Sequence, residues 1–154
     1  GRDRARGAWR RLPRSSAVTV FIDTAVIMYA AGSDHPLKRP CQRVLTRVAD
    51  GELDAAVSVE VVQEIVHRFT ALRRREQGAS IARDALDLFA PVLPITHATI
   101  RRLPELVERH PALAARDLVH VATCLEEGIV EIISPDRGFD AVPEVRRIDP
   151  TAAS

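Results

Sequence analysis

Lysine is almost absent from this chain of 154 residues, which carries its positive charge on arginine and contains a single lysine, Lys38. Cysteine is also scarce, and Cys41 and Cys124 lie too far apart in sequence to form a metal-type pair. We expect each cysteine to fill an apolar helix face, as is usual inside cells, rather than to form a disulfide. No apolar run approaches the roughly 20 residues of a membrane span, and no secretory signal is evident. These absences predict a cytoplasmic protein without a membrane partner.

Aromatic residues make up only 4% of the chain, although 46% of its residues are hydrophobic. The apolar residues are mainly alanine, valine, leucine and isoleucine, a composition that favours an α/β protein over a β-sandwich. The length is sufficient for one domain with a substantial core. Because the formal net charge is only +1, the overall charge gives no indication of a polyanionic partner.

The distribution of charge divides the chain into unequal parts. Residues 1–16 contain six arginines and one aspartate and show no apolar periodicity. We interpret them as a disordered extension or as residues foreign to the natural protein, in preference to a dedicated RNA-binding arm. We expect residues 17–150 to form the single domain and residues 151–154 to be a C-terminal tail.

Short apolar segments alternate with longer segments of helical periodicity along residues 17–150. The pattern predicts strands at 18–22, 53–57, 92–95, 129–133 and 145–148. It predicts helices at 24–31, 36–49, 58–75, 80–88, from 96 to before Pro111, and 116–128, with Gly78 as a break between the third and fourth. Such alternation is typical of a parallel sheet that is covered by helices on both faces.

Four carboxylates lie where this arrangement would bring them together. Asp23 and Asp136 directly follow strands, whereas Glu64 lies in a long helix and Asp117 in the first turn of another. The carboxyl ends of parallel strands meet at one edge of a sheet, which is where open α/β sheets bind their ligands. Several carboxylates in one cleft require protons or cations to compensate them, and Mg²⁺ or Mn²⁺ suits an all-oxygen site. Such a site activates water and neutralises charge in phosphodiester hydrolysis.

Four segments, VFIDT, SVEVVQEIVHRF, ARDLVHVATCLEEGI and IISPDRGFDAV, resemble the motif regions of PIN-domain ribonucleases in order and spacing. They most resemble the VapC-type toxins of bacterial toxin–antitoxin operons. The resemblance implies a three-layer α/β/α fold with a central parallel sheet of four to five strands. It also implies a Mg²⁺- or Mn²⁺-dependent endoribonuclease that hydrolyses RNA by metal-activated water.

The resemblance also implies roles for individual residues. The catalytic and metal-binding residues would be Asp23, Glu64, Asp117 and Asp136. The supporting residues would be Thr24, Ser134, Asp140 and Arg116, of which Ser134 would bond either Asp136 or a metal-bound water. The implied partners are an RNA substrate, a cognate antitoxin that buries an apolar helix in a groove, and a second copy of the chain.

Competing interpretations receive less support from the residues. Glu64-x-x-His67 and Asp117-x-x-His120 have the spacing of di-iron bundles, but that fold needs four long helices and no parallel sheet. We therefore interpret both histidines as residues of the core edge or as support for the ligands. A phosphatase or a receiver domain would need paired acids after the first strand and a lysine late in the chain. The single lysine, Lys38, lies in the wrong region for that role. A catalytically weak PIN-fold binding protein and a different metal-dependent phosphoesterase remain open alternatives.

Overall fold

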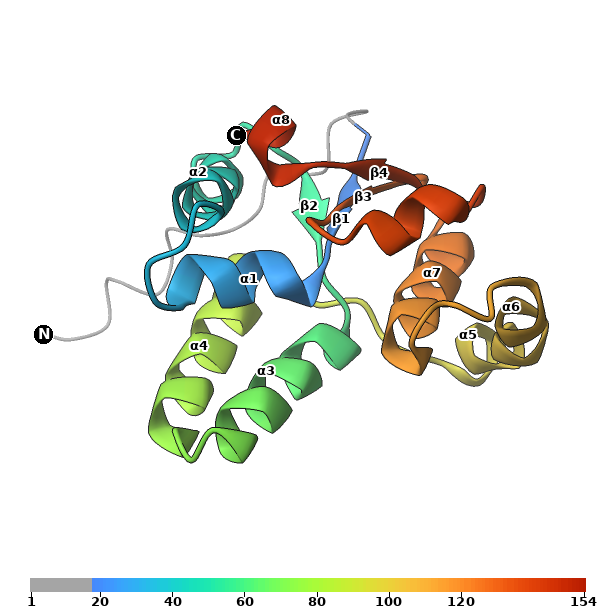
Figure 1. The fold of residues 1–154 in the computed structure, drawn as a ribbon, viewed down its shortest axis with the longest axis horizontal. Helices are drawn as coiled ribbons and strands as arrows, with labels where there is room; N and C mark the ends of the chain where they lie inside the picture. The colour runs from blue at the N-terminus through green and yellow to red at the C-terminus, as the bar shows by residue number, and fades with distance from the viewer. Residues whose placement is uncertain (1–17) are drawn as a thin grey trace, which may run out of the picture.

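The computed structural model describes residues 18–154, so the arginine-rich segment 1–16 lies outside the described residues. Its centre is a four-stranded sheet in which every neighbouring pair of strands is parallel (Figure 1). The strand order is β2-β1-β3-β4, with β1 at Val20–Ile22, β2 at Ala55–Ala56, β3 at Glu131–Ile133 and β4 at Arg146–Ile148. The predicted parallel sheet is thus confirmed.

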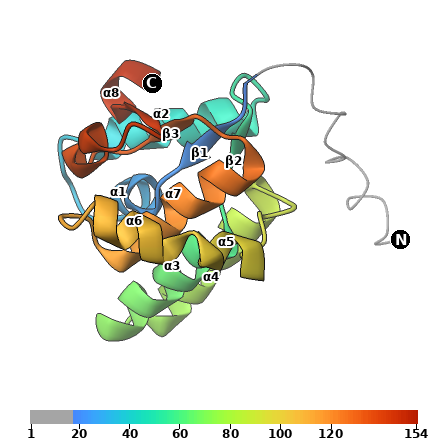
Figure 2. The same ribbon diagram turned by 90° about the vertical axis from the view of Figure 1, so that its right-hand side faces the viewer.

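Helices flank both faces of the sheet, as predicted for an α/β/α fold. Figure 2 places α2 and α8 on one side and α3 to α7 on the other. The helices are α1 Thr24–Ala31, α2 Lys38–Ala49, α3 Val59–Ala71, α4 Arg75–Leu88, α5 His97–Arg101, α6 Leu103–Arg109, α7 Ala115–Glu127 and α8 Pro150–Ala153, and a 3₁₀ helix, η1, spans Arg137–Ala141. No helix within residues 18–154 is long and apolar enough to cross a membrane.

Strand β1 lies at the centre of the core because it is apolar on both faces. Val20, Phe21 and Ile22 are all buried, and Phe21 lies in register with Ala56 of β2 and Ile132 of β3. A strand of this kind is expected between two helical layers. The residue that follows Ile22 is therefore delivered to the middle of the carboxyl edge of the sheet.

The prediction that Gly78 breaks the chain is wrong. Gly78 lies inside α4, where it is buried, and a Cβ atom there would lie 2.6 Å from the Cβ of Phe69 on α3. Its missing side chain therefore allows α4 to pack closely against α3. The helix predicted over 58–75 ends earlier, at Ala71, and the turn passes through Arg73 at a positive φ of 57°.

Two other predicted elements are reduced in the structure. The strand expected at 92–95 forms only an isolated parallel bridge, between Leu93 and Ser58. The helix expected from residue 96 is divided into α5 and α6 at Arg102, with a proline in the first turn of α6. By contrast, α7 ends as predicted at Gly128, which adopts the left-handed conformation with φ 69°.

The cysteines and the C-terminus complete the core. Cys41 on α2 and Cys124 on α7 are both buried and free, as expected for residues that fill helix faces. Residues 151–154, assigned to a tail, lie mostly in α8, whose Ala153 carbonyl accepts a hydrogen bond of 2.5 Å from Arg47 on α2. The C-terminal residues therefore pack onto the domain.

Candidate metal centre

Asp23 occupies the centre of the carboxyl edge, between the end of β1 and the start of α1. Its side chain is buried although carboxylates usually reach solvent, with the residue only 5% exposed. Ser134, which follows β3, donates a hydrogen bond of 2.6 Å to Asp23 Oδ2. The other oxygen, Oδ1, lies 3.6 Å from His120 Nε2 on α7. Asp23 is therefore oriented by residues from two neighbouring elements.

Glu64 reaches the same place from the second turn of α3. It is as buried as Asp23, at 5% exposure, and its Oε1 lies 3.3 Å from His120 Nε2. That distance permits an ion pair, but the oxygen has no correctly directed hydrogen-bond donor in the described part of the chain. A buried carboxylate oxygen with unused bonding capacity is costly unless a further partner binds it.

Asp117 approaches from the first turn of α7, where the helix dipole and unpaired amides favour a negative charge. It is half-buried. Asp23, Asp117 and His120 each offer one ligand atom, and these atoms lie within 4.8 Å of one another. We call Asp23, Glu64, Asp117 and His120 the acidic cluster.

His120 is the member of the acidic cluster that the sequence analysis did not place among the site residues. It is fully buried, and besides the two carboxylates its Nε2 lies 3.5 Å from the Thr24 hydroxyl. Its ring also contacts the ring of Phe21, with centroids 5.2 Å apart. The available signal was the spacing from Asp117, since residues three apart share one face of a helix. His67, which has the same spacing from Glu64, is exposed.

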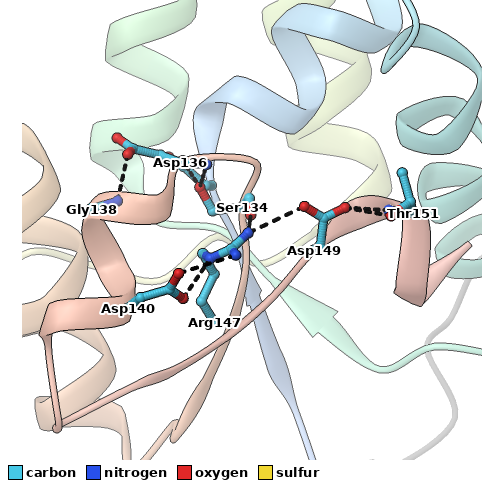
Figure 3. Close-up of polar contacts among 8 residues, drawn as sticks. Ser134, Asp136, Gly138, Asp140, Arg147, Asp149 and Thr151 are labelled. Atoms are coloured by element: carbon cyan, nitrogen blue, oxygen red, sulfur yellow. Dashed lines mark hydrogen bonds and ion pairs between the residues drawn. The ribbon is translucent and has the colours of Figure 1, made fainter.

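Ser134 and Asp136 lie close together in the segment that follows β3 (Figure 3). The Ser134 hydroxyl accepts a hydrogen bond of 3.0 Å from the Asp136 amide while it donates to Asp23. The Asp136 carboxylate caps η1 by accepting a bond of 2.8 Å from the Gly138 amide, and its side chain is exposed. Ser134 therefore bonds the carboxylate of Asp23 directly and links that carboxylate to the backbone of Asp136.

The two aspartates of the acidic cluster have raised pKa values, mainly because they are buried. Burial raises the pKa of Asp23, and the neighbouring Glu64 and Asp136 add to the rise, whereas His120 and Ser134 only partly offset it. Burial and the charge of Asp23 raise the pKa of Asp117 to about 6. For Glu64, burial alone would raise the pKa, but the contact with His120 outweighs it and lowers the pKa.

His120 experiences the reverse effects. Burial alone would lower its pKa, but the contact with Glu64 and the charges of Asp23 and Asp117 raise it. One imidazolium facing three carboxylates leaves the acidic cluster with a negative charge even when His120 is protonated. The cluster can therefore accept a cation.

The remaining predicted residues differ in how close they lie to the acidic cluster. Thr24 is buried and contacts His120, as described above. Arg116 is exposed at the start of α7, and its charge contributes to the lowered pKa of Glu64 and offsets a small part of the rise in the pKa of Asp117. Asp140 is exposed and directs its carboxylate toward Arg147 of β4, at 2.8 Å, so the structure does not bring it into the acidic cluster (Figure 3).

The donor set fits a divalent metal ion. Three carboxylates and one imidazole converge, one carboxylate oxygen lacks a hydrogen bond, and two of the acids have raised pKa values. Hard divalent cations prefer carboxylate oxygens, and Mn²⁺ also accepts imidazole nitrogen. Asp23 and Asp117 are placed to hold such an ion, with Glu64 and the charge-compensating His120 beside them and the exposed Asp136 nearby.

Comparison with known proteins identifies relatives over almost the whole described chain. Residues 20–145 match the PIN domain family. Ribonuclease VapC13 of Mycobacterium tuberculosis is 33% identical over 129 residues, which cover 84% of this chain and 98% of the relative. Ribonuclease VapC7 of the same organism is 33% identical over 135 residues, covering 87% of this chain and 93% of that protein.

Solved structures share the fold at lower sequence identity. The crystal structure of VapBC2 from Rickettsia felis, bound to a DNA fragment from its promoter, matches with a TM-score of 0.68 at 16% identity, covering 86% of this chain and 98% of that one. FitAcB from Neisseria gonorrhoeae gives a TM-score of 0.68 at 18% identity, with 85% and 97% coverage. Both likenesses concern the fold.

Proposed function

Because the chain belongs to the PIN domain family, we propose that it is a metal-dependent endoribonuclease that acts as the toxin of a toxin–antitoxin pair. The observation that carries this proposal is the acidic cluster, in which buried acids from three elements are left with too little positive charge. The curated relatives at 33% identity are named as ribonucleases, which supports RNA as the substrate. An RNA target places the proposed activity in the cytoplasm.

In this proposal one or two Mg²⁺ or Mn²⁺ ions are held by four carboxylates, those of Asp23, Glu64, Asp117 and Asp136. His120 lies against the first three of these carboxylates. A bound divalent cation would polarise water and neutralise the charge that develops on a scissile phosphate. Ser134 fixes one oxygen of Asp23, so that the other faces the cluster. His120 compensates part of the buried charge and keeps Glu64 ionised, as its lowered pKa indicates.

Arg116 is the residue best placed to bind the phosphate backbone of RNA. It adjoins Asp117 at the start of α7, its side chain is exposed, and its positive charge acts on the cluster. Guanidinium groups bind phosphate through two parallel hydrogen bonds. We therefore assign Arg116 to positioning the substrate beside the carboxylates.

An antitoxin partner is supported by the structural neighbours, several of which are toxin–antitoxin complexes. The groove best suited to it has a volume of about 490 Å³, between α1, α2 and α4. Its apolar lining includes Ile27 of α1, Leu45 of α2 and Ile81 of α4. An amphipathic helix binds such a groove through its apolar face. The second copy of the chain stays a prediction that a mass measurement in solution would test.

The groove can be tested separately from the active site. Ile81→Glu places a charge in the groove and should abolish inhibition by the antitoxin of the same operon while cleavage continues. Leu86→Glu on the same helix is a matched control, because Leu86 is exposed and lies outside the groove lining. Equal inhibition of both variants and the parent would place the antitoxin elsewhere.

The activity is tested by incubating the protein, freed of antitoxin, with a mixed pool of structured RNA in Mg²⁺, Mn²⁺ or EDTA. We expect cuts at few sites that require metal and leave 5′-phosphate and 3′-hydroxyl ends. Asp23→Asn and Asp117→Asn should both lose them. Asp87→Asn, which changes an exposed aspartate of α4, should cut like the parent protein.

Two results would contradict the proposal. Products with 2′,3′-cyclic phosphate formed in EDTA would mean attack by the 2′-hydroxyl of the RNA without metal. No cleavage in any metal by folded protein would favour a binding role or a different phosphoester substrate.

A further inference from the structure

Arg147 on β4 lies outside the acidic cluster, yet it contacts the residue that orients Asp23. Its side chain is only 12% exposed although arginine usually reaches solvent. One terminal nitrogen, Nη1, donates a hydrogen bond of 3.0 Å to the carbonyl oxygen of Ser134. The same group bonds two carboxylates, from Asp140 of η1 and Asp149 before α8 (Figure 3). We call Arg147, Asp140 and Asp149 the Arg147 network.

The geometry of the Arg147 network holds the guanidinium rigidly. Nε donates to Asp140 Oδ1 at 2.8 Å and Nη2 to Asp140 Oδ2 at 3.3 Å, which is a two-point pairing. Nη1 also lies 3.3 Å from Asp149 Oδ2. Asp149 is itself fixed, because its other oxygen accepts bonds from the amide and the hydroxyl of Thr151. Two acids from separate elements therefore determine where Arg147 points.

Both backbone polar groups of Ser134 are bonded to β4. Its amide donates to the Ile148 carbonyl at 3.1 Å, and its carbonyl accepts from Arg147. The hydroxyl of the same residue donates to Asp23 Oδ2 and accepts from the Asp136 amide. The position of one serine thus sets both an oxygen of Asp23 and the start of the segment that carries Asp136.

We propose that Arg147 is a positioning residue for the metal site, which acts by holding Ser134 so that Asp23 and Asp136 face the cation together. This inference rests on the proposed function. Asp140, assigned a supporting role from the resemblance, then acts on the site indirectly by fixing Arg147. Residues that orient metal ligands through hydrogen bonds typically change metal affinity about 10- to 100-fold when they are replaced.

Charge and position make opposite predictions for the loss of Arg147. Arg147→Gln removes a positive charge and leaves Asp140 and Asp149 uncompensated, so by charge alone the protein should attract Mn²⁺ more strongly. If Arg147 acts by position, the same variant should bind Mn²⁺ more weakly. The direction of the change therefore distinguishes the two roles, and a loss of global stability can be excluded by measuring well below the melting temperature of each variant.

The experiment measures the affinity of the metal-free full chain for Mn²⁺, from the free Mn²⁺ detected by electron paramagnetic resonance. We expect Arg147→Gln to weaken binding about tenfold. Arg147→Lys should weaken Mn²⁺ binding severalfold, because an ammonium group cannot reproduce the planar fork of hydrogen bonds that a guanidinium makes. If Arg147→Gln does not fold, the lysine variant is measured in its place. Arg146→Gln is the matched control, since Arg146 is the adjacent residue of β4, has a 72% exposed side chain and pairs with Glu131. It should bind like the parent.

Ser134→Ala tests whether Arg147 acts on the metal site through Ser134. If Arg147 acts through Ser134, adding Arg147→Gln to Ser134→Ala should cause little further loss, because the two effects are not independent. Unchanged or tighter Mn²⁺ binding by folded Arg147→Gln, or by Arg147→Lys in its place, would overturn the inference alone, as would full additivity with Ser134→Ala. A parent protein that binds no Mn²⁺ would overturn the proposed function together with it.

Discussion

The acidic cluster and the Arg147 network both gather aspartates around one basic side chain, but the pKa values of their aspartates shift in opposite directions. In the network, the pairing with Arg147 lowers the pKa of Asp140, and bonds from Thr151 with the charge of Arg147 lower that of Asp149. In the cluster, burial and mutual repulsion raise the pKa values of Asp23 and Asp117. In the network one guanidinium pairs directly with both aspartates, whereas in the cluster one buried imidazole faces three carboxylates.

This contrast separates structural from chemical carboxylates more reliably than residue type does. Asp136 and Asp140 lie four residues apart on the same segment, yet the Asp136 carboxylate accepts a hydrogen bond from the Gly138 amide while the Asp140 carboxylate pairs with the charged Arg147. A structural acid has its charge compensated by the protein and becomes costly only when its partner is removed. A cluster of acids whose negative charge is not compensated destabilises the protein until a ligand binds. Such acids, with shifted pKa values, are typical of binding sites.

The largest expected effect comes from removing the central acid of the cluster. Asp23→Asn should lower Mn²⁺ affinity and RNA cleavage by more than about 100-fold, because even residues that only orient ligands cost about 10- to 100-fold. The metal-free variant should melt at the same or a higher temperature than the parent, since a repelling charge is gone. Mn²⁺ titration and thermal unfolding without metal check both parts. If Asp23→Asn unfolds the protein, Asp23 is a structural residue.

His120→Gln removes the basic side chain of the acidic cluster and should destabilise the metal-free protein. Removal of one partner of a buried pair usually costs about 3 kcal/mol or more, because the remaining charge is uncompensated. We therefore expect the metal-free variant to lose about 3 kcal/mol of unfolding free energy at neutral pH, and bound Mn²⁺ to restore part of it. Denaturant titration with and without Mn²⁺ measures this. His67→Gln, which changes an exposed histidine on α3, is the control and should leave stability unchanged.

The pH dependence of metal binding should follow Asp117, whose pKa is raised to about 6. A proton on Asp117 competes with the cation, so Mn²⁺ affinity should rise up to about tenfold per pH unit between pH 5 and 6 and then level off. The raised pKa means that the folded metal-free protein binds the proton more tightly than the unfolded chain. Its stability contribution is therefore lost as the pH rises from about 4 through 6. Asp117→Asn should weaken this dependence in both curves, and the raised pKa of Asp23 should account for the dependence that is left.

Asp140→Asn should give the smallest effect, because Asp140 acts on the site only through Arg147. Arg147 keeps its bonds to Ser134 and Asp149 in this variant, so we expect at most about a threefold loss of Mn²⁺ affinity, which is below the loss of about 10- to 100-fold that is typical of residues that orient metal ligands. Cleavage of the same RNA pool should persist. A loss as large as that of Asp23→Asn would make Asp140 a metal ligand and would remove the distinction between the two groups of acids.

The sequence predicted the parts of the site that depend on strand ends and helix starts. Asp23 and Asp136 follow apolar strands, and Asp117 begins a helix, so the parallel topology alone brings them to one edge. Glu64 was predicted from its place in a long helix, and the resemblance to PIN-domain ribonucleases supplied RNA as the substrate and the roles of the individual residues. His120 supports the carboxylates, which is one of the two interpretations given to the histidines, whereas His67 is exposed and fits neither. The local pattern is the same whether a histidine on a helix packs in a core or faces carboxylates.

The remaining differences depend on contacts between distant segments. Arg147 gains its partners only when η1 and α8 fold against β4, and nothing in the local pattern distinguishes it from its neighbour Arg146. Gly78 has the local signature of a break, but its role is set by Phe69 on another helix. Such roles are determined by packing, which periodicity along one segment does not report.

The most direct measurement is the anomalous scattering of Mn²⁺ bound to crystals of the protein. The account predicts a peak within coordination distance of Asp23 and Asp117, with Asp140 and Asp149 still paired to Arg147. A peak at exposed carboxylates with the acidic cluster empty at saturating Mn²⁺ would contradict the claim that unmet negative charge marks the metal site.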